Sequence, residues 1–212
     1  MFTAPTGRPS VRYELSKRTL DFALALLLLI AGIPVWLLIA VLIKLDSQGP
    51  VIYSAWVHGR GCRPFRYYKF RTMRTGAPTT AHQAFVAAYI KGSHLQAKLR
   101  NDSRVTRVGR VLRAWSLDEV PQLVNVLLGD MSLVGPRPPL TYEFEHYSAR
   151  AKRRLTVRPG ITGLHQVNSR GRASFRRLVA TDLLYIRRRS LALDLVILAR
   201  TIPAVLSRRG AV

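Results

Sequence analysis

One uncharged apolar run, residues 22–43, constrains the fold of this chain more than any other feature. As an α-helix the run would be about 33 Å long, enough to cross the hydrocarbon core of a bilayer. It is too long for a secretory signal, and no cleavage site of small residues follows it. A helix that is apolar on every side is rarely the core helix of a soluble protein. The run therefore predicts a membrane element.

Basic residues flank this run on both sides. They are Arg8, Arg12, Lys17 and Arg18 before it, and Lys44, Arg60 and Arg63 after it. The charge asymmetry that orients a spanning helix is absent, which predicts both ends on the cytoplasmic face. Pro34, close after Gly32, is the expected bend. We expect a flexible tail over residues 1–15 and a re-entrant membrane helix over residues 16–48, with Pro34 as its kink.

The composition is strongly basic. The chain of 212 residues has 34 Lys and Arg against 11 Asp and Glu, a formal net charge of +23. This charge requires an anionic partner, and composition alone leaves nucleic acid, anionic lipid and a substrate with several phosphates open. The single cysteine, Cys62, cannot form an intramolecular disulfide, and the histidines show no metal-ligand spacing. The length and the lack of repeats are typical of one main domain.

Two adjacent carboxylates, Asp118 and Glu119, stand out in so basic a chain. The apolar residues that follow them recur at helical spacing and stop before Gly129; they are Val120, Leu123, Val124, Leu127 and Leu128. We expect a helix from about Glu119, with Asp118 as N-cap and Pro121 in the first turn. Both carboxylates would then lie at the positive end of the helix dipole, which favours their anionic forms.

The simplest interpretation of this pair is structural, because capping residues of this kind are common. The surrounding arginines favour chemistry. Arg104, Arg107, Arg110 and Arg113 precede the pair at helical spacing, and Arg137 follows it between two prolines. Guanidinium groups bind phosphate oxygens in pairs, so this arrangement is typical of a site for a substrate with several phosphates.

The remaining pattern predicts an α+β fold in which helices dominate. Strands at residues 51–54 and 64–70 should form a short β-hairpin, with Lys69 and Arg71 on its basic face. Helices are expected at residues 81–100, 142–154, 175–187 and 191–206. The last two are amphipathic and basic, as in helices that lie at the interface of anionic membranes.

Five segments together resemble one family. They are K-R-T-L-D at residues 17–21, K-F-R-T-M at 69–73, the stretch 116–138 with S-L-D-E-V-P-Q and G-P-R-P, R-P-G-I-T-G-L at 158–164, and the end of the chain from Asp182. In this order, over about residues 16–210, they resemble the bacterial sugar transferase family of monotopic polyprenyl-phosphate phosphoglycosyltransferases. The resemblance implies a re-entrant membrane helix and a catalytic domain over residues 49–212 on the cytoplasmic face of the bacterial inner membrane.

The resemblance also implies a reaction. A sugar 1-phosphate would pass from a UDP-sugar to undecaprenyl phosphate, which initiates exopolysaccharide, capsule or O-antigen synthesis. Asp118 would be the nucleophile, through a covalent aspartyl-phosphosugar, and Glu119 would bind Mg²⁺. Phosphate or nucleotide contacts would come from Lys69, Arg71, Arg113, Arg137 and Asp182. For Asp182 an internal salt bridge with an arginine is an equal alternative.

Departures from the family pattern are informative. The kink of the family usually has serine before proline, whereas this chain has Ile33 before Pro34. The insertion around residues 81–100 and the terminal R-R-G-A-V resemble the hexose-1-phosphate branch, so glucose or galactose is expected, with an N-acetylhexosamine as the alternative. His165 stands where an aromatic or small residue is more usual, and we expect a surface histidine.

Rival functions explain less of the sequence. A nucleic-acid-binding module would account for the arginines but not for the apolar run, and the chain has no RNP or helix-turn-helix signature. A non-catalytic membrane scaffold would not account for the carboxylate pair. We therefore expect an enzyme whose partners are a UDP-sugar, undecaprenyl phosphate and anionic membrane lipids, without nucleic acid. The identity of the sugar, the polyprenol length, the glycan pathway and a homodimer stay open.

Overall fold

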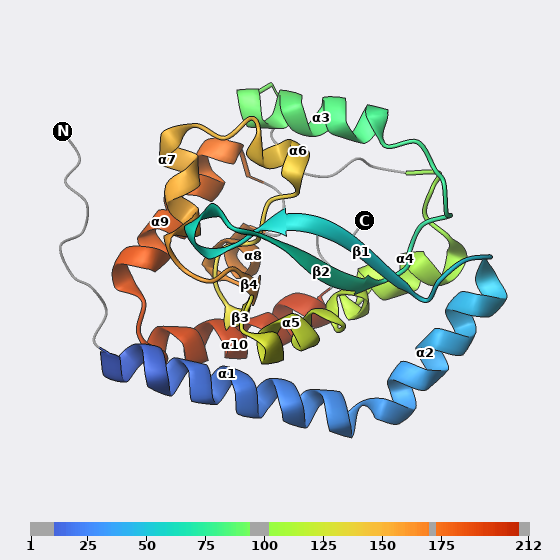
Figure 1. Ribbon diagram of the computed structural model, residues 1–212, viewed down its shortest axis with the longest axis horizontal. Helices are drawn as coiled ribbons and strands as arrows, with labels where there is room; N and C mark the ends of the chain where they lie inside the picture. Colours follow the sequence, from blue (N-terminus) through green and yellow to red (C-terminus); the bar gives the residue numbers. More distant parts are fainter. Residues whose placement is uncertain (1–10, 94–101, 170–172, 208–212) are drawn as a thin grey trace.

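The computed structural model describes residues 11–93, 102–169 and 173–207 (Figure 1). The helices in these ranges are α1 Val11–Ala31, α2 Ile33–Asp46, α3 Thr80–Lys91, α4 Arg107–Ala114, α5 Gln122–Leu128, α6 Thr141–Phe144, α7 Ala149–Lys152, α8 Leu164–Ser169, α9 Phe175–Arg188 and α10 Leu191–Leu206. The strands are β1 Ile52–His58, β2 Pro64–Phe70, β3 Ser132–Val134 and β4 Gly160–Thr162. The helices outweigh the strands, in agreement with the expected α+β class.

The N-terminal helices form a bent pair along one side of the molecule (Figure 1). α1 and α2 meet at an angle of 63° around Gly32, and Pro34 lies in the first turn of α2. A proline in a first turn needs no N–H partner, which is why the second helix begins there. No single helix of the described residues is long and apolar enough to cross a membrane, whereas this pair meets both conditions together. The bend expected at Pro34 is thus present.

The bend forms without a hydroxyl before Pro34, because Trp36 closes it. Its indole N–H donates to the carbonyl of Leu29 in the last turn of α1, at 3.2 Å. A Cβ on Gly32 would lie only 2.1 Å from the indole ring, so position 32 accepts no side chain. The hydrogen bond that Ile33 cannot offer is therefore supplied by Trp36.

Apolar side chains are exposed along both helices of the bent pair. On α1 they are Val11, Leu15, Phe22, Leu26, Leu27, Leu28 and Ile30. Val11, Leu15, Phe22, Leu26 and Ile30 share one helical stripe, and Leu27 and Leu28 are exposed on other sides of the helix. On α2 they are Ile33, Val35, Leu37, Leu38, Val41, Leu42 and Leu45. α10 adds Leu195, Val196, Ile202 and Leu206. A folded protein in water rarely leaves so many large apolar side chains uncovered, and this surface suits an apolar surrounding.

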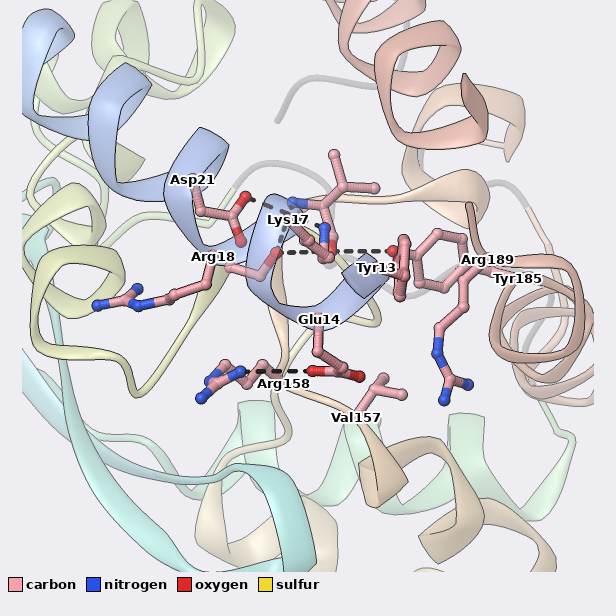
Figure 2. Close-up of a pocket in the computed structure, with 11 residues that line it drawn as sticks. Tyr13, Glu14, Lys17, Arg18, Asp21, Val157, Arg158, Tyr185 and Arg189 are labelled. Atoms are coloured by element: carbon pink, nitrogen blue, oxygen red, sulfur yellow. Dashed lines mark hydrogen bonds and ion pairs between the residues drawn. The ribbon is translucent and has the colours of Figure 1, made fainter. Parts of the chain in front are cut away.

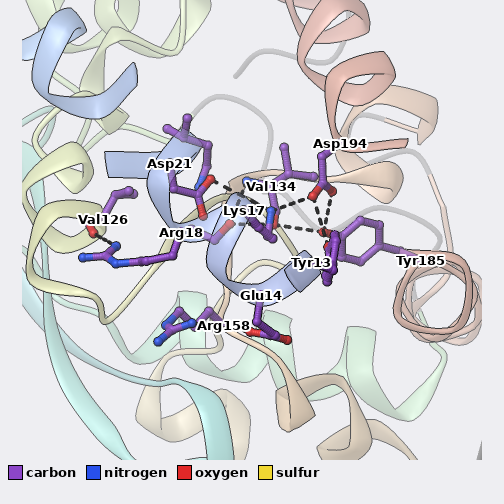
Figure 3. A network of polar contacts seen from close by, with 12 residues as sticks. Tyr13, Glu14, Lys17, Arg18, Asp21, Val126, Val134, Arg158, Tyr185 and Asp194 are labelled. Carbon is purple, nitrogen blue, oxygen red and sulfur yellow. Dashed lines mark hydrogen bonds and ion pairs between the residues drawn. The ribbon is translucent and has the colours of Figure 1, made fainter. Parts of the chain in front are cut away.

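The segment K-R-T-L-D ties α1 to the rest of the protein (Figure 3). Lys17 donates to the buried carboxylate of Asp194 at 2.9 Å, and the hydroxyl of Tyr185 donates to the same carboxylate at 2.7 Å. Arg18 donates to two backbone carbonyls at the C-terminal end of α5. Asp21 accepts a backbone N–H of β3 at 3.1 Å. This sequence element therefore fixes the membrane-type helix against α5, β3 and α10.

The strands form two small sheets in the described part of the chain. β1 and β2 pair antiparallel, with Tyr53 opposite Lys69, as the expected hairpin, although β1 extends to His58. β3 and β4 pair parallel, with Ser132 opposite Gly160, and this pair was not expected. A Cβ on Gly160 would lie 2.0 Å from the backbone nitrogen of Gly135, so the two segments approach closely only because both are glycine there.

Several expected helix boundaries are corrected by local chemistry. α1 begins at Val11, inside the expected tail of residues 1–15. α3 ends at Lys91 because Gly92 adopts φ 97° and caps it, and residues 94–101 of the expected helix lie outside the described residues. The expected helix over residues 142–154 is divided into α6, α7 and a 3₁₀ turn, Arg153–Thr156, with Ser148 capping α7. α9 and α10 agree with the expectation.

Candidate active site

Asp118 and Glu119 lie in a 3₁₀ turn, Leu117–Glu119, and not at the start of α5. The cause is Pro121. An α-helical bond to the carbonyl of Leu117 would come from the N–H of residue 121, which proline lacks, and the carbonyl accepts from Val120 at 3.3 Å instead. Pro121 is itself the N-cap of α5. The expected N-cap role of Asp118 is therefore wrong, and the pair precedes the helix by a tighter turn.

Two cations hold the carboxylate pair. Nζ of Lys69 lies 2.6 Å from Oε1 of Glu119 and 3.5 Å from Oδ2 of Asp118. The guanidinium of Arg137 lies 3.2 Å from the same Oε1. Asp118 is only 7% exposed, whereas the side chain of Arg137 is 53% exposed. The site thus consists of the buried Asp118 and the partly buried Glu119 against the partly buried ammonium of Lys69, with a guanidinium on its solvent side.

Burial sets the ionisation of Asp118. It raises the pKa of this carboxyl above its usual range, and Lys69, Arg113 and Arg137 act in the opposite direction. Burial alone would lower the pKa of Lys69, but Glu119 and Asp118 outweigh it and raise that pKa. The anion expected from the helix dipole therefore depends mainly on Lys69. Because folded Asp118 binds its proton more tightly than unfolded Asp118, its contribution makes stability fall as pH rises toward the raised pKa.

Asn125 positions Lys69 relative to the acid pair. It is fully buried on α5 and reaches across to β2, where its amide nitrogen donates to the carbonyl of Arg66 at 2.7 Å. Its amide oxygen accepts the backbone N–H of Tyr68 at 3.2 Å. Both bonds go to main-chain groups just before Lys69, so they hold the strand and the helix in one register. This residue was missed from the sequence, although an amide inside an apolar helical pattern was a visible signal.

Arg154 and Asp182 lie directly behind Arg137. The Arg154 guanidinium is buried and donates to Asp182 at 2.7 Å, to the hydroxyl of Tyr147 at 2.7 Å and to the backbone carbonyl of Arg137 at 3.1 Å. Asp182 is 2% exposed. Of the two roles considered for Asp182, the structure shows the internal salt bridge with an arginine. Arg154, which the sequence did not single out, connects this bridge to the main chain of Arg137.

The structure does not bring all the expected basic residues to the pair. Arg71 is buried and donates to backbone carbonyls at the C-terminal end of α2, including those of Ser47 and Gln48. Its guanidinium is therefore committed to capping the membrane-type helix. Arg104 pairs with Asp102 at 2.6 Å. Arg113 lies in the last turn of α4, close enough to influence Asp118, and among the described residues its guanidinium has no hydrogen-bond partner.

His165 corrects an expectation. It begins the first turn of α8 and is 6% exposed, so it is not a surface histidine. Neither ring nitrogen has a hydrogen-bond partner among the described residues, and burial lowers the pKa of the imidazole. α8 packs against α9 and α10, which covers the side chain. The ring is therefore neutral near pH 7, with two unsatisfied polar atoms.

The donor set for a metal is small. The described residues contain no group of three or more His, Cys, Asp or Glu side chains that would enclose an ion. Mg²⁺, however, is commonly held by one or two carboxylates while substrate phosphates and water complete its shell. Asp118 and Glu119 fit that kind of site. They do not fit a metal that requires a complete protein cage.

The fold and site together define a class: an enzyme that acts on phosphate-bearing substrates beside an exposed apolar helix pair. Residues 12–208 match the family described as bacterial sugar transferase, and the chain belongs to this family. It is 43% identical to the exopolysaccharide production protein ExoY of Sinorhizobium fredii, over 92% of this chain and 88% of the relative.

Two further relatives carry more specific names. One is the UDP-glucose:undecaprenyl-phosphate glucose-1-phosphate transferase of Caulobacter vibrioides, 45% identical over 96% of this chain and 74% of the relative. The other is the undecaprenyl-phosphate galactose phosphotransferase of Salmonella typhimurium, 39% identical over 92% of this chain but only 41% of the relative. These names support the hexose-1-phosphate branch that the sequence indicated.

Removal of the Lys69 charge should raise the pKa of Asp118 further. In Lys69→Met the buried carboxyl loses its nearest cation, so its ionisation should move to higher pH than in the wild type. The measurement is a carbon NMR titration of labelled aspartate carboxyls in micelles, assigned with Asp118→Asn. Lys91→Met, which removes an exposed lysine of α3, is the control and should leave the titration unchanged. An unchanged or lower pKa in Lys69→Met would contradict the role assigned to this lysine.

Proposed function

We propose that this protein transfers a hexose 1-phosphate, glucose or galactose, from a UDP-sugar to undecaprenyl phosphate in the synthesis of an exopolysaccharide. The observation that carries the proposal is the pair of the buried Asp118 and the partly buried Glu119 between Lys69 and Arg137, in a chain of the sugar transferase family. Two of the relatives named above act, by their names, on undecaprenyl phosphate, and one of these also on UDP-glucose. No feature of the site favours an N-acetylhexosamine.

In the first step Asp118 attacks the sugar-bearing phosphorus of the donor. A bond forms between a carboxylate oxygen and that phosphorus, the bond to the bridging oxygen breaks, and UMP leaves with the electron pair. Lys69 keeps Asp118 anionic and, with Arg137, supplies positive charge where the diphosphate must lie. The guanidinium of Arg113, which acts electrostatically on Asp118 and has no partner among the described residues, is available for the same phosphates.

In the second step a phosphate oxygen of the lipid attacks the phosphosugar on Asp118, and the bond to the carboxylate breaks. The product is undecaprenyl diphosphate sugar, and Asp118 returns as the anion. Two steps suit the site because a soluble donor and a lipid acceptor need not occupy it together. The backbone of Arg137 is held by the Arg154–Asp182 bridge, which keeps its guanidinium oriented through both steps.

Mg²⁺ fits the two carboxylates, and Glu119 is its proposed protein ligand. When bound, the ion would neutralise charge on the diphosphate and assist the departure of UMP. Glu119 shares Oε1 with Lys69 and Arg137 in this structure, so its carboxylate is already oriented by two cations.

The bent pair is proposed to enter and leave the bilayer through one face, the cytoplasmic face of the inner membrane. Its exposed apolar side chains and the bend of 63° support a re-entrant element. α10 would lie against the same membrane through its exposed apolar residues, and the basic α9 beside it suits anionic lipids. Residues 49–212 would then lie on the cytoplasmic side.

Asp118→Asn should abolish transfer and preserve the fold. The amide keeps the shape but removes the nucleophile, so transfer should fall on the order of 10⁴-fold or more. The measurement is UMP release with UDP-glucose or UDP-galactose and undecaprenyl phosphate. Wild-type protein quenched without lipid should carry a sugar-phosphate mass on the peptide with Asp118. Glu145→Gln, which removes an exposed carboxylate away from the acid pair, is the control and should retain activity. Transfer near the wild-type rate in Asp118→Asn, or an adduct elsewhere, would refute this nucleophile.

Removal of divalent cations should stop the reaction. Excess EDTA should abolish UMP release and added Mg²⁺ should restore it, because the diphosphate charge is otherwise left to the basic side chains. Glu119→Gln should be inactive or nearly so and should lose the response to Mg²⁺ concentration. The exposed Glu145→Gln is the control and should respond as the wild type. Full turnover in EDTA would remove the metal from the proposal.

Both ends of the bent pair should be accessible from one side. Single cysteines at Arg12 and Gln48, in a Cys62→Ser background, should both react with an impermeant maleimide only when the cytoplasmic side faces the reagent. Right-side-out and inverted sealed vesicles make the comparison. A cysteine at Glu145 reports the side of the catalytic domain. Labelling of the two test positions from opposite sides would replace the re-entrant element with a spanning one.

A further inference from the structure

A basic groove lies apart from the acid pair. It has a volume of about 550 Å³, within the range of small-ligand sites, roughly 300–1,000 Å³. Its walls are the turn of the β-hairpin, the turn after α5 and the start of the R-P-G-I-T-G-L segment. The charged side chains that line it are Arg60, Arg63, Arg158 and Asp130. Lys69, Asp118, Glu119 and Arg137 do not line it, so the proposed reaction does not account for it.

The groove adjoins the first turns of α1. Arg60 and Arg158 each place a guanidinium nitrogen 3.8 Å from Oε2 of Glu14, and Figure 2 shows Glu14 and Arg158 facing each other. Glu14 precedes Leu15, a member of the exposed apolar stripe of α1. Phe22, where the uncharged run begins, lies only about 12 Å further along the helix axis. The groove therefore opens beside the polar end of a surface that suits lipid chains.

The charges in the groove are not balanced internally. Three guanidinium groups face two carboxylates, and Glu14 lies beyond hydrogen-bond distance from both of its arginines. Arg158 uses its Nε to hold the carbonyl of Gly129 at 3.0 Å, and its Nη1 lies 3.8 Å from Glu14. The turn between Gly59 and Arg63 keeps Arg60 and Arg63 on one short loop. Guanidinium groups that line one groove suit the oxygens of a phosphodiester.

We propose that this groove binds the phosphate of an anionic phospholipid headgroup, whose acyl chains lie along the apolar stripe of α1. The lipid would hold the N-terminal part of α1 at the bilayer surface while the bend reaches deeper. Glu14 competes with the headgroup for Arg60 and Arg158, so it weakens the site and makes release possible. The inference rests on the membrane association proposed above and not on the transfer chemistry.

Binding to vesicles tests the groove directly. Full-length protein is titrated with vesicles of phosphatidylcholine alone or with added phosphatidylglycerol. The gain in affinity from phosphatidylglycerol should fall about fivefold per arginine, hence about 25-fold, in Arg60→Gln/Arg63→Gln. Binding to pure phosphatidylcholine should not change. Arg74→Gln/Arg150→Gln removes the same charge from two exposed arginines outside the groove and should lose less than about twofold. Equal losses in the two double variants would overturn the proposal.

Glu14 provides an independent test, in which the affinity for anionic vesicles should rise and not fall. Glu14→Gln frees both arginines and should raise affinity for phosphatidylglycerol vesicles about threefold or more. Glu145→Gln makes the same charge change on an exposed residue away from the groove and should have little effect. Thermal unfolding of each variant checks that the fold is retained. The same response in both variants would contradict a role for Glu14.

A third set of vesicles distinguishes a phospholipid headgroup from the phosphate of undecaprenyl phosphate. Phosphatidylcholine vesicles with undecaprenyl phosphate should not reproduce the arginine-dependent gain. If they alone reproduced it, the groove would be a site for the acceptor and the phospholipid proposal would be wrong. If the wild type bound none of the vesicles, the membrane association itself would fail. If it bound phosphatidylcholine with no gain from phosphatidylglycerol, only the groove proposal would fail.

Discussion

The close placement of two adjacent carboxylates, one of them buried, is the constraint on which the site depends. Two acids side by side repel each other, and taking either charge out of water is expensive unless a cation lies within contact. Lys69 meets that requirement for both, and Arg137 does so for Glu119 from the solvent side. The position of Lys69 is therefore as important as the acids themselves. Its strand must stay in register with the turn that carries them.

α5 is the element that couples this register to the membrane-type helices. Its N-terminal end follows the turn with Asp118 and Glu119, and its middle holds β2 through Asn125. Its C-terminal carbonyls accept from Arg18 of α1. A second capping arginine, Arg71, lies just after β2 and binds the end of α2. Each half of the bent pair is thus fastened to one of the two elements that build the site. This arrangement would hold the acids at a fixed depth relative to a bilayer surface.

The local sequence pattern and the family resemblance were sufficient to predict those features that depend on short segments of the chain. The apolar run, its bend, the hairpin, α9, α10 and the acid pair were all predicted from residues close together in the chain. The features that were missed depend on residues far apart. Asn125 and Arg154 act on main-chain groups of other elements, and no periodicity shows which backbone group a buried side chain will reach. β3 and β4 are three residues each, too short for an alternating pattern. Arg71 was expected on the same strand face as Lys69, but β2 ends at Phe70, and the Arg71 side chain binds the end of α2 instead.

The contacts of Glu119 also explain how the site would respond to its substrate. Its Oε1 is shared by Lys69 and Arg137. Both cations are therefore already partly neutralised by Glu119. A diphosphate offers these two cations new oxygens with a higher charge, so they gain partners when they turn partly away from Glu119. Glu119 would then need another cation, and a divalent ion bound with the diphosphate would meet that need. In the proposed reaction Lys69 and Arg137 would shift from Glu119 to the donor, while Arg154 and Asp182 hold the backbone of Arg137. Because Asp118 is buried, the phosphorus of the donor would have to move to it.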